Sequence, residues 1–204
     1  LCLTIVIGIP FGVIAAVRQN GIIDKITLIV ALFFISVPAF FLALLAQLLF
    51  AMKLQIFPVT GAETWRHYVL PIVILGVGQI AGQVRMTRSS MLDVLSQDYI
   101  RTANSKGASN MHVIIHHALR NGLLPVITGI GNSVAYLFSG AAVIEMVFAI
   151  PGLGTLMVNA VQTVDVPMVM GPIIFTSLLV NLVNTIVDMA YAFIDPRVKL
   201  KYMK

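Results

Sequence analysis

Charged residues are scarce in this chain. Of its 204 residues, 10% are Asp, Glu, Lys or Arg, whereas 59% are hydrophobic. An ordinary soluble domain has about 25% charged and about 45–50% apolar residues. Because the surface of a small soluble domain must carry polar groups, this composition excludes a soluble fold of the same length. It also excludes a disordered chain, which needs low hydrophobicity. Lipid must therefore surround most of the protein.

Other features are missing as well. Cys2 is the single cysteine, so an intrachain disulfide and a cysteine metal cluster are excluded. The chain has no G-x-x-x-x-G-K-[ST] loop, and we expect it to hold no ATP or other cofactor itself. It begins at Leu1, with neither an initiator Met nor a signal peptide, which indicates that an N-terminal segment precedes it. The net charge of +5 does not indicate nucleic-acid binding, since the basic residues gather on short loops.

Five long apolar stretches predict an all-α, polytopic membrane protein. A membrane-spanning helix needs about 20 apolar residues, and backbone polar groups in lipid must pair within the segment. The stretches meet or approach that length and lack the alternation of a strand. We expect a kink at Pro38, and close helix contacts at the pairs Gly8/Gly12 and Gly78/Gly82. The five predicted helices cover residues 1–17, 26–52, 68–84, 123–150 and 168–194.

Basic residues lie mostly on one side of these predicted spans. Eleven of the 13 Lys and Arg residues fall after the first helix, in the segment 85–120 or in the C-terminal tail. The other side has only Lys53 and Arg66. The positive-inside rule therefore predicts that the segment 85–120 and the C-terminus face the cytoplasm.

The polar segment 85–120 carries helix signals of its own. Ser96 precedes a helix-compatible run, with Asp98 in the first turn and Lys106 in the last, as the helix dipole favours. Gly107 stands where a helix-ending glycine is expected, and Ser109 can cap the helix that follows. The pattern predicts a helix, a glycine turn and a second helix. Such an element favours docking of a cytoplasmic partner, although a solvated linker is the alternative.

Three separated blocks carry a family resemblance. The segments DYIRTANSKG (98–107) and HALRNGLLP (117–125) form the first block, EMVFAIPGLG (145–154) the second, and DPR (195–197) closes the last helix. Together they resemble the permeases of dipeptide, oligopeptide and nickel ABC importers, most closely the first of the two paired permeases. The resemblance covers essentially the whole chain. In the wider motif of the superfamily a Glu stands where this chain has Arg101, whereas Ala103, Gly107 and Leu119 match.

The resemblance implies a type I ABC importer permease fold, with residues 1–204 as one transmembrane domain and 85–122 as its cytoplasmic coupling loop. It implies a multi-pass protein of the cell membrane that pairs with a second homologous permease. Two cytoplasmic ATP-binding subunits and an extracytoplasmic substrate-binding protein would complete the complex. The chain itself would not be an enzyme; its cargo would be di- or oligopeptides, or nickel.

The short helix of that loop is implied to be the coupling helix, which fits a groove on the ATPase. The residues expected to couple to the ATPase are Asp98, Arg101, Thr102, Ala103, Lys106 and Gly107. Ala103 has no bulk and would allow close approach, and Gly107 permits a sharp reversal. The charges of Arg101 and Lys106 would act on association more than on affinity.

Rival functions rest on other residues. An ion-coupled secondary transporter would use acids in the membrane, and Glu145 and Asp188 lie within or near the last two predicted helices. We favour structural pairing or a gate-side role for these two acids. His112 and His116 have the spacing of a zinc-protease pair, but Val113 stands where the catalytic Glu would be. We interpret these histidines, with His117, as the polar face of an interfacial helix. An intramembrane enzyme would need catalytic groups that converge on one site, and the sequence does not indicate such a set.

Overall fold

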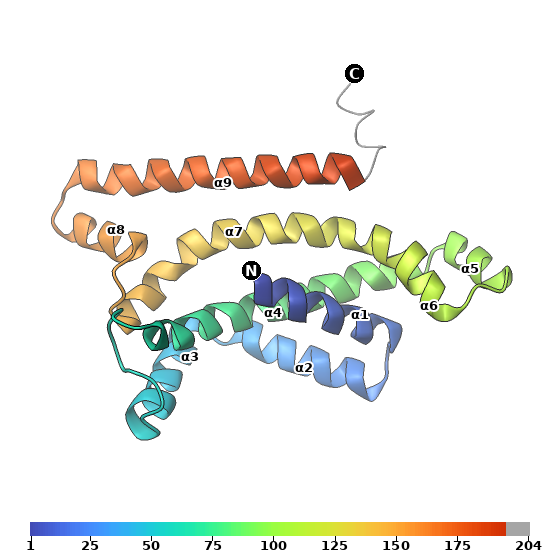
Figure 1. The fold of residues 1–204 in the computed structure, drawn as a ribbon, viewed down its shortest axis with the longest axis horizontal. Coiled ribbons are helices and arrows are strands. Elements are labelled where there is room, and N and C mark those ends of the chain that lie inside the picture. The colour runs from blue at the N-terminus through green and yellow to red at the C-terminus, as the bar shows by residue number, and fades with distance from the viewer. Residues whose placement is uncertain (195–204) are drawn as a thin grey trace, which may run out of the picture. The chain divides into compact units, whose positions relative to one another are not determined.

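A computed structural model describes residues 1–194, apart from the side chains of residues 132, 135–140, 188 and 190–194. The described residues are helical and contain no strand, as predicted (Figure 1). In chain order the elements are η1 (Thr4–Gly8), α1 (Ile9–Val17), α2 (Ile22–Ser36), α3 (Ala39–Ala46), η2 (Gln47–Lys53), α4 (Trp65–Leu95), α5 (Asp98–Ser105), α6 (Asn110–His112), η3 (Val113–Leu119), α7 (Arg120–Phe148), α8 (Leu153–Gln162) and α9 (Val166–Ile194). The three η elements are π-helical. The predicted 195–197 block and the basic tail lie outside the described residues.

Three helical stretches of the described chain are long and apolar enough to cross a membrane: Trp65–Leu95, Asn110–Gly131 and Val166–Val187. Two bent helix pairs raise this number to five if each pair forms one broken span. Thr4–Val17 is a shorter apolar helix. The chain is therefore a membrane protein with several candidate spans.

The predicted boundaries need three corrections. The stretch 26–52 is not one kinked helix, because α2 and α3 meet at 95°. Pro38 is extended, with φ −58° and ψ 135°, and α3 begins only after it. The third helix does not end at residue 84, since α4 continues to Leu95 with Met91 fully buried. The predicted helices 123–150 and 168–194 leave residues 151–167 without a helix, but α8 lies there.

The described chain forms two compact units. Unit 1 contains residues 1–35, 79–131 and the end of α9, and its α1 lies close to α4. A Cβ atom on Gly8 would stand 2.8 Å from Gln83 Cβ, and one on Gly12 would stand 2.8 Å from the Val84 carbonyl oxygen. Only glycine permits this approach, so the first predicted glycine pair is confirmed. The second is wrong for contacts within the described chain, because a Cβ on Gly78 or Gly82 would meet nothing within 4 Å.

Unit 2 contains residues 36–78 and 132–185. Its core joins α3, η2, α4 and α7 through small and aromatic side chains, with Phe148 and Ile144 almost fully buried. Gln47 Nε2 donates to the carbonyls of Val59 (2.7 Å) and Val147 (3.2 Å). The Gly61 N–H donates to the Phe148 carbonyl at 2.9 Å. These bonds fasten the loop after η2 to the end of α7.

Candidate functional site

The predicted short helix is present as α5, and its ends follow from local chemistry. Gln97 is its extended N-cap residue, and Asp98 lies in the first turn as expected. Gly107 has φ +82°, donates to the Asn104 carbonyl at 3.0 Å and is followed by an Ala108 N–H that points to the Ala103 carbonyl at 3.4 Å. These two bonds form a Schellman motif, which confirms the helix-ending role of Gly107.

The second predicted helix is also confirmed. The Ser109 hydroxyl accepts the His112 N–H at 3.4 Å, as expected of a capping residue. From Asn110 onward, α6, η3 and α7 follow one another without a break. In Figure 1, α5 and α6 form a tight corner, so the glycine turn reverses the chain over very few residues.

The inner face of α5 is apolar and packs within unit 1. Ile100 is only 3% exposed and belongs to a buried cluster with Ala16 of α1, Met91 of α4, and Val113 and Ala118 of η3. We call this set the α5 cluster. The cluster places α5 in one apolar core with residues of α1, α4 and η3.

The outer face of α5 is polar and exposed. Of the six residues predicted for coupling, Ala103 is the exception: it is half-buried and packs against the α5 cluster. Its small size thus serves the packing of α5 on its own chain. The five that reach the surface are Asp98, Arg101, Thr102, Lys106 and Gly107, and the exposed Tyr99, Asn104 and Ser105 extend the same face.

Two hydrogen bonds connect the start of α7 to its neighbours, one to α5 and one to α4. Asn121 Nδ2 donates to the Tyr99 hydroxyl at 3.0 Å, and Ser90 Oγ donates to the Gly122 carbonyl at 2.7 Å. A Cβ on Gly122 would stand 2.6 Å from Met91 Sδ, so α4 and α7 lie in close contact there. The sequence did not indicate these pairings, because partners at such separations have no local pattern.

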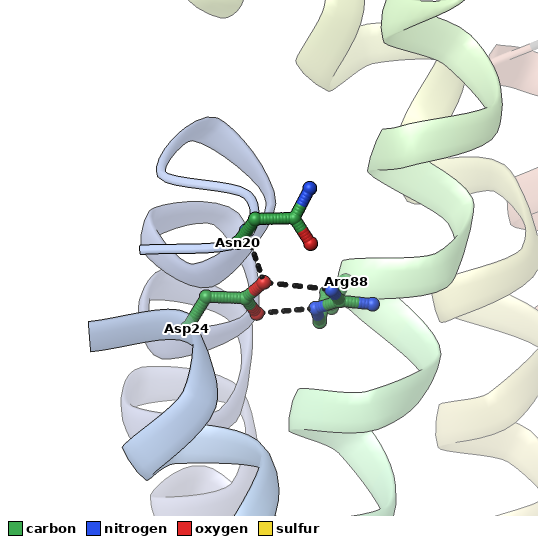
Figure 2. A network of polar contacts seen from close by, with 3 residues as sticks. All are labelled: Asn20, Asp24 and Arg88. Atoms are coloured by element: carbon green, nitrogen blue, oxygen red, sulfur yellow. Dashed lines mark hydrogen bonds and ion pairs between the residues drawn. The ribbon is translucent and has the colours of Figure 1, made fainter. Parts of the chain in front are cut away.

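A buried ion pair joins the first turn of α2 to α4 (Figure 2). The guanidinium of Arg88 donates through Nε to Asp24 Oδ1 and through Nη2 to Oδ2, the latter at 2.7 Å. The Asn20 N–H donates to the same Oδ2 at 2.8 Å. The sequence alone did not indicate this pair. The available signal was a carboxylate and a guanidinium at the ends of otherwise apolar runs, where burial requires a partner.

Glu145 has a structural contact in unit 2. Its Oε2 accepts the Thr155 N–H at 2.9 Å, close to the N-terminus of α8, where a helix favours negative charge. The Thr155 hydroxyl in turn accepts the Gly152 N–H at 2.9 Å. Structural pairing of Glu145 is therefore confirmed. The side chain of Asp188 lies outside the described residues.

The three clustered histidines are exposed, as expected of a polar helix face. The rings of His112 and His116 stack with centroids 4.3 Å apart, and His117 lies 5.7 Å from His112. Ring planes that are nearly parallel, 18° apart, do not aim their nitrogen lone pairs at one point. Among the described residues, no group of three or more His, Cys, Asp or Glu side chains has the arrangement of a metal site.

Solved structures share this fold. A chain of the MetNI methionine ABC transporter, described as inward-facing, superposes with a TM-score of 0.73 and covers 95% of this chain and 88% of its own length. At 20% sequence identity this likeness concerns the fold alone.

Sequence comparison gives much closer relatives. The dipeptide transport system permease protein DppB of Bacillus subtilis (strain 168) is 45% identical over 203 residues, covering 98% of this chain and 65% of the relative. The glutathione transport system permease protein GsiC of Escherichia coli (strain K12) is 41% identical over 197 residues, covering 97% and 64%. This chain thus spans slightly less than two thirds of either protein. Residues 8–200 match the family described as the binding-protein-dependent transport system inner membrane component. With one match across nearly the whole chain and relatives this similar, the chain belongs to that family.

Proposed function

We propose that this chain is the membrane-spanning permease part of an ATP-driven ABC importer, and that α5 is the element through which a cytoplasmic ATPase moves it. The observation that carries the proposal is the division of α5 into two faces. Ile100 holds one face in a buried cluster with residues of α1, α4 and η3, while polar side chains from Asp98 to Lys106 are exposed on the other. A helix held in place by its own chain presents these charges in a fixed arrangement, which suits a partner of complementary charge.

The mechanism follows from this arrangement. The ATPase subunits bind and hydrolyse ATP, and their closure around nucleotide displaces α5. Because Ile100 of α5 shares one buried cluster with residues of α1, α4 and η3, we expect these helices to follow as a body. The permease then changes between inward- and outward-open arrangements, a rigid-body form of alternating access. In this scheme the residues of α5 carry force and do no chemistry.

The family supports the partners that we propose. A second homologous permease completes the pathway, two cytoplasmic ATP-binding subunits drive it, and an extracytoplasmic substrate-binding protein delivers the cargo. The segment 85–122 and the C-terminus face the cytoplasm in this scheme, as their basic residues favour. One contact supports this orientation. Arg88 pairs with Asp24, so the segment 85–120 and the segment after the first predicted helix, both predicted to be cytoplasmic, meet at the same end of unit 1.

The cargo we propose is a di- or oligopeptide. The two relatives above are named for dipeptide and glutathione transport, and both of these cargoes contain peptide bonds. Nickel is the alternative that the wider resemblance leaves open. An ion-coupled transporter is disfavoured, because the Glu145 carboxylate is engaged at the N-terminus of α8.

The test is reconstitution of the complete transporter in liposomes with its ATPases, second permease and binding protein. We expect ATP-dependent uptake of labelled dipeptides, glutathione or longer peptides, and no uptake without ATP. Uptake of Ni²⁺ without uptake of peptides would identify nickel as the cargo. Uptake that follows an ion gradient and ignores ATP would contradict the proposal.

A further inference from the structure

The ion pair between Asp24 and Arg88 has a geometry that fixes position as well as charge (Figure 2). Both carboxylate oxygens of Asp24 are used, each by one nitrogen of the guanidinium, and Oδ2 also accepts the Asn20 N–H. The Asp24 side chain is 2% exposed and that of Arg88 17%. A two-point contact of this kind defines the distance and the angle between its partners.

The N-terminal end of α2 has little apolar burial. Asp24 and Ala31 are the buried residues of this helix. Ala31 packs against Ala81 and Val84 of α4, further along. Nearer the ion pair, Ile22, Ile26 and Ile29 are 77%, 57% and 66% exposed. The ion pair therefore supplies the directional contact between this end of α2 and α4.

On α4, the attachment of α2 lies next to that of α5. Arg88 precedes Met91 by three residues, or about 4.5 Å along the helix axis, and Met91 is fully buried in the α5 cluster together with Ile100. Any displacement that α5 imposes on α4 at Met91 is thus imposed within one helical turn of the ion pair.

We propose that Asp24 and Arg88 are positioning residues that make α2 move together with α4 and α5. In this role both residues act through the helices that they join. This inference rests on the proposed coupling role of α5 and extends it to α2. Apolar residues can replace the stability of a buried ion pair, but they do not reproduce its two-point geometry. Loss of the pair should therefore separate ATP hydrolysis from transport.

The experiment uses the complete transporter in liposomes and measures co-purified ATPase, ATP hydrolysis and peptide uptake per ATP hydrolysed. Asp24→Asn keeps the shape of the side chain and removes its charge. We expect normal co-purification and continued hydrolysis, with uptake per ATP reduced on the order of ten-fold. Arg88→Lys, which keeps the charge and loses the two-point contact, should give an intermediate loss.

A double variant separates a loss of coupling from a failure to fold. Asp24→Leu combined with Arg88→Leu replaces the ion pair by apolar contact, and we expect it to assemble and to remain poorly coupled. Lys25→Gln and Arg85→Gln are matched controls, because these exposed cations lie one residue from Asp24 and three residues from Arg88. Both should keep the wild-type uptake per ATP.

Wild-type uptake per ATP in Asp24→Asn, or in the double Leu variant, would overturn this inference and leave the proposed function intact. A loss of uptake fully accounted for by a smaller amount of assembled complex would also overturn it, because a merely structural role predicts that result. Failure of the proposed function is distinguishable, since the wild-type complex itself would then show no ATP-dependent uptake.

Discussion

Two helix-to-helix corners of this chain differ in what holds them. At the first, α5 turns at Gly107 into α6, and the apolar Ile100 anchors it while its polar side chains are exposed. At the second, α7 turns through Gly152 into α8, and the contacts are polar: the Glu145 carboxylate and the Thr155 hydroxyl accept the N–H groups of Thr155 and Gly152. We call these the α5 corner and the α8 corner.

The difference agrees with the proposal that the α5 corner is a surface for a partner, whereas the α8 corner supports the chain's own fold. At the α8 corner, the carboxylate is used by the fold itself, beside a helix N-terminus. At the α5 corner, Arg101 and Lys106 are exposed. Their charges are solvated by water and are not used by ion pairs of the described fold.

The largest expected effect comes from Gly107→Pro at the α5 corner. Proline holds φ near −65°, whereas Gly107 has φ +82°, and it removes the N–H that bonds to the Asn104 carbonyl. We expect peptide uptake to be abolished while membrane insertion, measured by fractionation, is unchanged. Gly107→Asn is the control, because asparagine tolerates a positive φ and a Cβ there meets nothing within 4 Å. Normal uptake in the Pro variant would contradict the role of this turn.

Ile100→Ala should have the next largest effect. Removing a buried isoleucine side chain costs about 2–5 kcal/mol, here from the packing of α5 on its cluster. We expect slower uptake and more rapid proteolysis of the segment after α4. The matched control is Thr102→Ala, on the exposed face of the same helix. Equal protease sensitivity of the two variants would show that the inner face does not hold α5.

Charge reversal on the outer face should act differently from the loss of Ile100. Arg101→Glu and Lys106→Glu leave the buried cluster intact, so protease resistance should match that of the wild type. We expect slower association with the ATPase subunits, by about ten-fold at low salt, and a smaller difference at high salt. Surface plasmon resonance at two ionic strengths measures this. An unchanged association rate would place the docking surface elsewhere.

Glu145→Gln at the α8 corner should have the smallest effect. The amide oxygen of glutamine can still accept the Thr155 N–H, so only the charge-assisted part of that bond is lost, about 1 kcal/mol. We expect peptide uptake close to that of the wild type. Glu145→Leu removes the acceptor and should lower thermal stability further. If Glu145→Gln abolished uptake, a proton-carrying role would gain support and the contrast between the corners would fail.

The sequence predicted most where the chemistry is local. The extent of α5, the turn at Gly107 and the cap at Ser109 follow from neighbouring residues, and all three are confirmed. The break at Pro38 was underestimated, because proline identity alone does not tell whether a helix bends or restarts. The prediction ended α4 too early because it used polarity, whereas a helix with a buried face can continue past its apolar run.

Long-range pairings could not be predicted. Asp24 and Arg88 are 64 residues apart, and no periodicity relates them. The inward direction of Ala103 likewise depends on which face of α5 meets α4 and η3. Of the two glycine pairs, only Gly8/Gly12 lies against another helix, and sequence spacing does not distinguish it from Gly78/Gly82.

The most direct test of the central claim is site-specific cross-linking from α5 to the ATPase subunits in native membranes. Replacement of Cys2 by serine leaves these 204 residues without a cysteine. Single cysteines are then placed at the exposed Ser105 and at the half-buried Ala103 and labelled with a photoactivatable reagent. The account predicts strong cross-links to the ATPase from position 105, changing with bound nucleotide, and weak ones from position 103. No cross-link from position 105, or equal cross-links from both positions, would contradict it.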